Sequence, residues 1–161
     1  MSEQPRFGAT LTQVGAYEFN VKFDVAEMPE LRVDEAPPLG AAAGPNPDRL
    51  LAVAVAHCLA SSLNFCMAKF KQDAGGVTAR VNGVLERNER GRLRVGNLEV
   101  EIRLGKKAAD IQHFDRCAGQ FEDFCIVTAS IRQGIPVSVR VVDASGAAVF
   151  EDTAGTSGAR E

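Results

Sequence analysis

Four cysteines are the residues of this sequence with the widest chemical range. Cys58 and Cys66 lie eight residues apart, and so do Cys117 and Cys125. Zinc sites use cysteine pairs separated by roughly two to four residues, so this spacing does not favour a metal site. Two interpretations remain. The cysteines are either catalytic thiols, since a thiolate is a nucleophile, or small apolar residues buried in the core.

The segment that carries Cys58 has the start signals of a helix. Asn46 suits the N-cap, Pro47 suits the first helical position, and Asp48 places negative charge at the positive end of the helix dipole. From Pro47 to about Lys71 the residues are apolar on most faces, as in a central core helix or a membrane span. No second span or basic flank accompanies it, so we predict a core helix and no membrane association.

Alternating apolar and polar residues predict strands before this helix. Residues 7–25 indicate a hairpin that turns at Gly15, and a short strand is expected at 31–33. Further along, residues 76–89 and 92–105 predict a long antiparallel pair.

The last third of the chain changes period twice. From Ala108 the pattern is helical, and residues 123–133 predict a second short helix that ends at Gly134. Residues 135–150 return to a strand pattern, and a polar tail follows. We therefore predict one domain over residues 1–152 and a flexible tail over 153–161.

Composition limits the class of protein. The 161 residues are 45% hydrophobic and carry a formal net charge of -3. Such a chain can bury one core, and it lacks the positive field that nucleic acid or an anionic membrane attracts. The first residues do not form a secretory signal, and four cysteines at this length are not a disulfide framework. We expect a cytoplasmic protein with reduced thiols.

Two stretches resemble one known family. They are "DEAPPLGAAAGPNPDRLLAVAVAHCL", which ends just after Cys58, and "FCIVTASIRQGIPVSVRV", which contains Cys125. Together they resemble the osmotically inducible protein C and organic hydroperoxide resistance family (OsmC/Ohr), and most closely its OsmC-like branch. The resemblance implies an α+β fold with two antiparallel sheets, six-stranded in the family, around a long central helix in an intertwined homodimer. It also implies a thiol peroxidase without metal, flavin or other cofactor.

The resemblance further implies roles for three residues. Cys58 matches the peroxidatic thiol and Cys125 the resolving thiol, and a dithiol reductant would restore the pair. Asp48 stands where the family has a glutamate that orients peroxide and thiol. Cys66 and Cys117 match no functional position and are expected to be packing residues.

Helix geometry constrains the role of Asp48. Ten residues separate it from Cys58, which is about 15 Å along the axis, so the two cannot meet within one helix. A functional Asp48 would have to act on the thiol of a partner chain. The alternative is that it only stabilises the start of its helix.

One family feature has no match. The N-terminal hairpin offers Lys22 and no arginine to lower the pKa of the peroxidatic thiol. Arg32, on the connection to the helix, could take that role across a dimer, although it could equally be an exposed loop residue.

Acidity and pocket lining can also be considered from spacing. Cys125 lies at the start of its helix, whereas Cys58 is about three turns inside its own, so Cys125 should be the more acidic thiol. The residues at helical spacing around Cys58 form a mainly apolar stripe that could hold an alkyl chain or simply pack in the core. They are Leu51, Val55, Ser62 and Phe65.

Two functions follow. The first is a cysteine-based peroxidase that acts on organic hydroperoxides, which the cysteine pair favours. The second is a protein of the same fold that binds a small apolar or thiol ligand without turnover, which the missing arginine favours.

Overall fold

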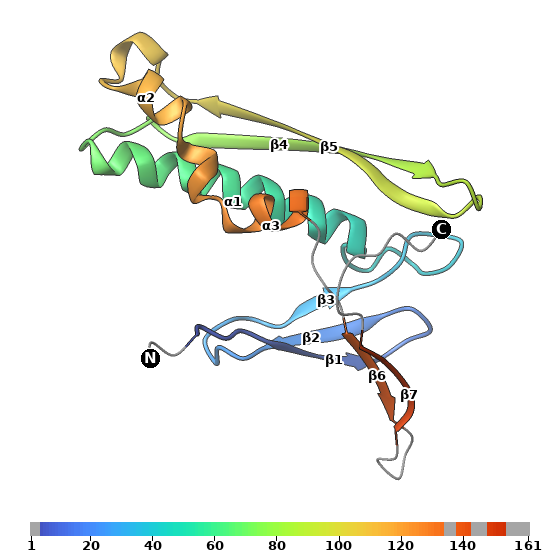
Figure 1. Ribbon diagram of the computed structural model, residues 1–161. Helices are drawn as coiled ribbons and strands as arrows, with labels where there is room; N and C mark the ends of the chain where they lie inside the picture. Colours follow the sequence, from blue (N-terminus) through green and yellow to red (C-terminus); the bar gives the residue numbers. More distant parts are fainter. Residues whose placement is uncertain (1–3, 134–137, 143–147, 154–161) are drawn as a thin grey trace. The chain divides into compact units, whose positions relative to one another are not determined.

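A computed structural model describes residues 4–133, 138–142 and 148–153 of the chain (Figure 1). The strands form a three-stranded sheet in the order β1-β2-β3 and two two-stranded sheets, β4-β5 and β6-β7. The elements are β1 Ala9–Gln13, β2 Phe19–Phe23, β3 Leu31–Val33, α1 Pro47–Lys69, β4 Val77–Arg87, β5 Leu93–Leu104, η1 Ala108–Asp110, α2 Phe114–Ala118, η2 Phe121–Phe124, α3 Ile126–Gln133, β6 Ser138–Val142 and β7 Ala148–Thr153.

The chain divides into two compact units. The first contains the residues up to Ala56 together with Ala79–Ile102, and the second contains His57–Thr78 together with the residues from Arg103 onward. The helix α1 therefore contributes its first turns to one unit and its remaining turns to the other.

An antiparallel sheet with one apolar face begins the first unit. Leu11 pairs with Val21, and Val21 pairs with Leu31, so these apolar side chains share a face. Val21 and Val33 are buried on it. The same face lines a cavity of about 560 Å³ that also includes Pro47 at the start of α1.

The loop between β3 and α1 is organised around one buried carboxylate. Asp34 accepts hydrogen bonds from the amides of Glu35 at 2.8 Å, Ala41 at 2.8 Å and Ala43 at 3.1 Å. The amides of Ala43 and Ala41 outweigh burial and lower the pKa of Asp34, so it is ionised at neutral pH. The family-like "DEAPPLG" stretch therefore acts first as a scaffold for the start of α1.

Close backbone packing fixes the same region. A Cβ atom on Gly44 would overlap the backbone carbonyl of Arg32 in β3, so only glycine fits there. Two residues later, the side-chain oxygen of Asn46 accepts from the amide of Arg49 at 3.3 Å. Asn46 is therefore the N-cap of α1, and the predicted helix start at Pro47 is confirmed.

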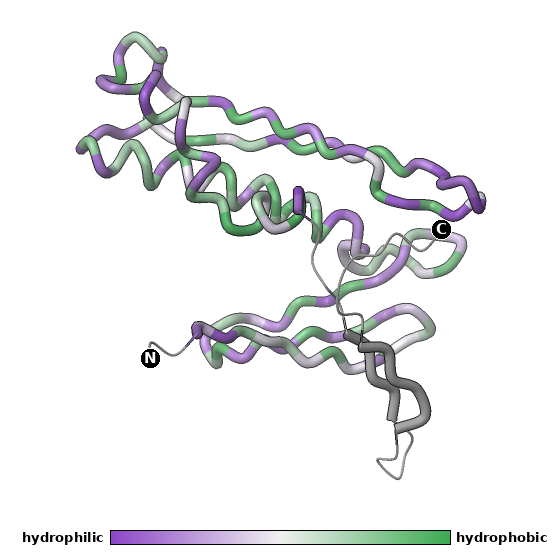
Figure 2. Tube along the Cα trace, viewed as in Figure 1, coloured by the Kyte–Doolittle hydropathy of each residue, from purple (hydrophilic) through white to green (hydrophobic). Residues whose placement is uncertain are grey.

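Most of α1 is apolar, as the green tube in Figure 2 shows. Among the described helices it is the one long and apolar enough to cross a membrane, with a mean hydropathy of 1.8 over a stretch of 18 residues, of which 39% are buried. The core helix of a soluble protein can have the same length and composition.

In the second unit, residues 108–125 run antiparallel to the end of α1. The amide of Gln112 donates to the side chain of Gln72 at 3.1 Å, and the ring of His113 lies 5.0 Å from that of Phe70. Further along, Phe124 meets Phe65 edge to face at 5.6 Å. Residue numbers therefore rise along one segment as they fall along the other.

Several sequence predictions of elements are confirmed. The class is α+β, the N-terminal hairpin is β1 and β2, and the short strand is β3. The long pair is β4 and β5, which Figure 1 shows as two adjacent strands. The six-stranded sheets that the resemblance implied are not present among the described residues, where no sheet exceeds three strands.

Other boundaries were wrong, and the reasons are local. The helix α1 stops at Lys69 and not at Lys71, because Lys71 has a positive φ of 54°. The predicted continuous helical segment from Ala108 is broken into η1, α2 and η2. The second helix starts at Ile126 and not at residue 123, because Cys125 is extended.

Two expectations concern the end of the chain. The strand pattern predicted over 135–150 corresponds to two antiparallel strands, β6 and β7, in which Ser138 pairs with Thr153. Gly134 and residues 154–161, where a helix end and a tail were predicted, lie outside the described residues.

Candidate active site

Two helices of the second unit bring Cys58 and Cys125 together. Cys58 lies within α1, and Cys125 directly precedes α3. The carbonyl of Cys125 accepts from the amide of Ala129 at 3.1 Å, so Cys125 is the N-cap residue of α3. All four cysteines are free thiols, and those of Cys58 and Cys125 are joined by a side-chain hydrogen bond.

Hydrogen-bond donors of α3 surround both sulfurs. The Sγ of Cys125 lies 2.9 Å from the Oγ1 of Thr128 and also interacts with the amide of Thr128 and the side chain of Ser62. The sulfur of Cys58 accepts from the amides of Val127 and Thr128. These are the second and third residues of α3, whose amides have no partner within the helix. The two thiols therefore share the positive end of α3.

These contacts shift the pKa values of the two thiols in opposite directions. Burial opposes ionisation of Cys125, but the hydrogen bonds with Cys58, Thr128 and Ser62 outweigh it and lower the pKa of Cys125. Burial and the hydrogen bond with Cys125 raise the pKa of Cys58, although the α3 amides oppose the rise. The lowered pKa of Cys125 agrees with the greater acidity predicted for this thiol from the sequence. When Cys125 is ionised, the thiol of Cys58 therefore donates a hydrogen bond to the thiolate of Cys125.

Solvent exposure also differs between the two thiols, and the less acidic thiol is the more exposed one. Cys58 is partly exposed, whereas Cys125 is 0% exposed. The more acidic thiol is thus covered, and the less acidic one is within reach of a small molecule.

Glu122 and Asp123 are acidic residues that precede Cys125 in the sequence. The carboxylate of Glu122 accepts from the guanidinium of Arg132 at 2.6 Å. This ion pair spans η2 and α3 and offsets one of the two negative charges.

Apolar side chains are exposed close to Cys125 in sequence. Phe124 is 38% exposed and Ile126 is 80% exposed. Phe65, which is half exposed, contacts the ring of Phe124, and the ammonium of Lys69 lies 4.4–4.5 Å from both ring centres. Of the four residues predicted to line an alkyl pocket, Phe65 and Ser62 belong to this unit, and Ser62 contacts the thiol pair.

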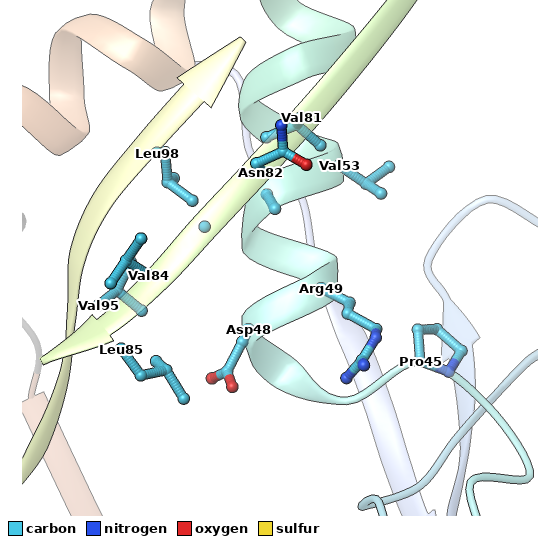
Figure 3. Close-up of a pocket in the computed structure, with 12 residues that line it drawn as sticks. Pro45, Asp48, Arg49, Val53, Val81, Asn82, Val84, Leu85, Val95 and Leu98 are labelled. Atoms are coloured by element: carbon cyan, nitrogen blue, oxygen red, sulfur yellow. The ribbon is translucent and has the colours of Figure 1, made fainter.

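The other predicted site residues belong to the first unit. Asp48 lines a cavity of about 590 Å³ with Arg49 at the start of α1. In Figure 3 these two charged side chains lie at one end, and apolar side chains of β4 and β5 form the wall. The lining of this cavity does not include Leu51, which is half-buried, or Val55, which is buried.

Arg32 is engaged within its own sheet. Its side chain donates to Glu18, and this hydrogen bond and charge raise the already high pKa of Arg32. It is exposed to solvent. Within this chain it is an ion-paired residue of β3.

In the described part of the chain, no three His, Cys, Asp or Glu side chains are grouped closely enough to hold a metal ion.

Sequence reasoning missed the donors around the thiols. Thr128 lies three residues after Cys125, the spacing at which an N-cap side chain meets the N3 amide, so this contact had a readable signal. The donation from Val127 to Cys58 had none, because it depends on how α1 and α3 pack.

Comparison with known proteins gives a family match. The model of one family, described as OsmC-like protein, matches residues 40–140. A search of curated protein sequences gave no match.

Solved structures of similar fold extend the comparison. The structure of an OsmC-like protein of unknown function from Vibrio cholerae is 16% identical, with a TM-score of 0.62 over 78% of this chain and 93% of that one. An organic hydroperoxide resistance protein OsmC from Legionella pneumophila is 16% identical, with a TM-score of 0.61 over 81% and 92%. An organic hydroperoxide resistance protein from Elizabethkingia anophelis is 26% identical, with a TM-score of 0.52 over 80% and 90%.

Proposed function

Because this chain belongs to the OsmC-like protein family, we propose that it is a cysteine-based peroxidase that reduces organic hydroperoxides through a cycle between Cys58 and Cys125. The observation that carries the proposal is the hydrogen-bonded thiol pair at the start of α3. The family match and the names of the Legionella and Elizabethkingia proteins support it.

The first half-reaction begins with one proton shared by the pair. The proton of Cys58 moves to the more acidic Cys125, and the amides of Val127 and Thr128 stabilise the thiolate left on Cys58. This thiolate attacks the hydroxyl oxygen of the hydroperoxide, so that an S–O bond forms and the O–O bond breaks. Cys58 becomes a sulfenic acid. The departing alkoxide takes the proton from Cys125 and leaves as an alcohol.

The second half-reaction closes the disulfide. The thiolate of Cys125 attacks the sulfur of the sulfenic acid, an S–S bond forms, and hydroxide leaves and is protonated by solvent. A dithiol reductant then returns two electrons and two protons to the pair. No metal, flavin or other cofactor takes part in this cycle.

Backbone amides take the part of the missing arginine. An arginine would stabilise the thiolate by charge and hydrogen bonding. In this chain two amides, a hydroxyl and the paired thiol supply the hydrogen bonds, and the start of α3 supplies partial positive charge.

Exposed aromatic and aliphatic side chains favour an organic substrate. Phe65, Phe124 and Ile126 offer apolar surface near the thiol pair, which rewards an alkyl or aryl substituent on the peroxide. Hydrogen peroxide has no such group.

Assembly and compartment belong to the same proposal. We assign the chain to an intertwined homodimer in the cytoplasm, where thiols stay reduced. Asp48 and Arg32 act in this scheme on the thiol pair of the second copy, with Leu51 and Val55 as substrate-pocket residues. Arg32 would first have to leave Glu18.

The test is mass analysis after one equivalent of cumene hydroperoxide. The parent protein should lose two hydrogens and show a peptide in which Cys58 is linked to Cys125. Cys125→Ser should consume about one equivalent and then stall as a sulfenic acid on Cys58 that dimedone traps. Cys58→Ser should not turn over, whereas Cys117→Ala is a matched thiol control that should keep activity.

Two outcomes would contradict parts of this proposal. Sulfenic acid trapped on Cys125 in the Cys58→Ser variant would exchange the roles of the two thiols. Consumption of peroxide by the parent no faster than by free cysteine would remove the peroxidase altogether.

The apolar cavity of the first unit favours one alternative. It combines apolar walls with the charges of Asp48 and Arg49, which suits a small apolar or thiol ligand bound without turnover. Binding of such a compound that survives Cys58→Ser, in a protein without peroxidase activity, would support it.

A further inference from the structure

Cys66 and Cys117 are a second pair of thiols, and the proposed peroxidase cycle does not use them. Cys66 is 0% exposed and Cys117 is 1% exposed. Their side chains are joined by a hydrogen bond. Cys66 and Cys117 are therefore a buried pair and not two isolated thiols.

The antiparallel packing of the second unit explains how two pairs arise. Cys58 and Cys66 are separated by eight residues along α1, and Cys117 and Cys125 by eight residues along the facing segment. Because the two segments run in opposite directions, the later cysteine of one meets the earlier cysteine of the other. Equal spacing then places one thiol pair at each end of the contact.

The local contacts give the two sulfurs of the second pair different roles. The side-chain amide of Gln120 donates to the Sγ of Cys66 at 3.4 Å. Burial, and then the hydrogen bond with Cys66, raise the pKa of Cys117 to about 11, so Cys117 keeps its proton and donates it. Cys66 thus accepts hydrogen bonds from both Gln120 and Cys117.

We propose that Cys66 and Cys117 form a second redox site, a buried dithiol that hydrogen peroxide converts to a disulfide independently of Cys58 and Cys125. The sulfur of Cys66 attacks one oxygen of the peroxide, forming an S–O bond as the O–O bond breaks, and its proton leaves with the other oxygen as water. Cys117 then attacks the sulfenic acid sulfur, and its proton leaves with that oxygen as a second water. Two thiols lose two electrons in total, and one peroxide gains them.

Access to this site depends on local opening. Cys117 lies in α2, a helix of five residues flanked by short 3-10 turns. Helices of this length have little stability of their own, so brief opening of α2 admits a small oxidant. Oxidation of the second pair is therefore slower than that of the partly exposed Cys58.

The two sites do not exchange disulfides directly. Eight residues of helix separate Cys58 from Cys66, which is about 12 Å along the axis and far beyond the distance of a disulfide bond. Each pair is oxidised by peroxide in its own right. The oxidised second site would tie α2 to the end of α1.

The experiment isolates the second pair. The Cys58→Ser/Cys125→Ser variant, which keeps only Cys66 and Cys117, is treated with excess hydrogen peroxide while folded, then denatured and alkylated. We expect alkylation to fall from two thiols per chain to none, a mass loss of two hydrogens, and a non-reduced peptide linking Cys66 to Cys117. Dithiothreitol should restore both thiols. The melting temperature of the oxidised form should rise by several degrees.

Matched variants and the parent make the result decisive. Adding Cys66→Ala should leave Cys117 free and alkylatable after the same treatment. Gln120→Leu, which removes the donor to Cys66, should slow formation of the link several-fold. If the double serine variant does not fold, peptide mapping of the parent under excess peroxide gives the same answer.

Two results would overturn the proposal. Both thiols could remain alkylatable after excess hydrogen peroxide, or Cys66 could over-oxidise to a sulfinic acid without a link to Cys117. Because the first pair is absent from the test protein, neither result depends on whether the parent is a peroxidase.

Discussion

At the scale of residues, the two thiols of the first site divide two requirements of a peroxidatic cysteine. A nucleophile needs access to substrate, which Cys58 has, and a low pKa, which Cys125 has. The hydrogen bond between them lets the buried thiolate accept the proton of the accessible thiol. In the proposed cycle, reactivity therefore belongs to the pair, and any side chain that stabilises Cys125 as a thiolate also acts on Cys58.

Thr128 tests this coupling. Thr128→Val keeps the shape of the side chain and removes the hydroxyl that lowers the pKa of Cys125. A hydrogen bond of about 1 kcal/mol corresponds to roughly a fivefold change. The first peroxide turnover at neutral pH should slow by that factor, and the alkaline arm of the pH profile should recover it, since a raised pKa moves thiolate formation to higher pH.

Stopped-flow measurement of the first turnover across pH, together with the rate of iodoacetamide alkylation, checks this prediction. Thr128→Ser retains the hydroxyl and should behave as the parent. An equal loss at every pH would mean that the valine perturbs packing and leaves acidity unchanged.

Part of this candidate site could be predicted from the sequence. Cys58 and Cys125 could be chosen from family-like stretches, and the greater acidity of Cys125 from its place before a helix. The hydrogen bonds that backbone amides donate to Cys58 could not be predicted, because these amides belong to residues almost seventy positions away. Phe124 and Ile126 were missed because exposed apolar side chains have no pattern of their own.

At the scale of elements, α1 depends on its first turn. Asn46 caps the helix with its side-chain oxygen, which accepts from the amide of Arg49 at 3.3 Å and from its guanidinium at 2.9 Å. Asn46 is 9% exposed, so water does not readily replace these bonds. The cap therefore sets where the helix begins.

Asn46→Ala should lower the free energy of unfolding by about 1 kcal/mol, since it removes the cap. Urea denaturation followed by circular dichroism measures this change. Asn46→Ser keeps a capping oxygen and should recover most of the loss. Equal stability of the alanine variant and the parent would show that another group caps α1.

Helix α1 was predictable because strong start signals precede a long apolar run. The segment from Ala108 was not, because its helical period extends over three short pieces, η1, α2 and η2. Such pieces are held by contacts with α1, including Phe124 of η2 with Phe65. Tertiary contacts of this kind override local periodicity.

At the scale of the whole molecule, the described chain leaves much apolar surface uncovered. Val53 of α1 is 59% exposed and Phe65 is 52% exposed. A helix that is apolar on most faces needs covering on most faces. The α+β class could be predicted from one chain, but the six-stranded sheets could not be tested on it, because a sheet shared between chains has no signal in either chain alone.

Sedimentation at micromolar concentration should therefore show a dimer, because a second copy can bury the exposed residues of α1. Val53→Glu places a charge on this surface and should shift the equilibrium toward monomer. Lys71→Glu, an exposed charge change just after α1, is the control and should not shift it. A stable parent monomer with a cooperative melt would remove the intertwined assembly and any role of Asp48 across it.

The tight contact between Gly44 and β3 constrains the evolution of the sequence. Every single-nucleotide change in a glycine codon that alters the amino acid introduces a residue with a Cβ atom. At Gly44 each of these residues would collide with the carbonyl of Arg32. No missense mutation is therefore tolerated at this codon unless β3 moves as well. Descendants of this gene should thus keep the glycine of "GPNP" even after the cysteines have drifted, so that the motif records ancestry of the fold and not retention of its chemistry.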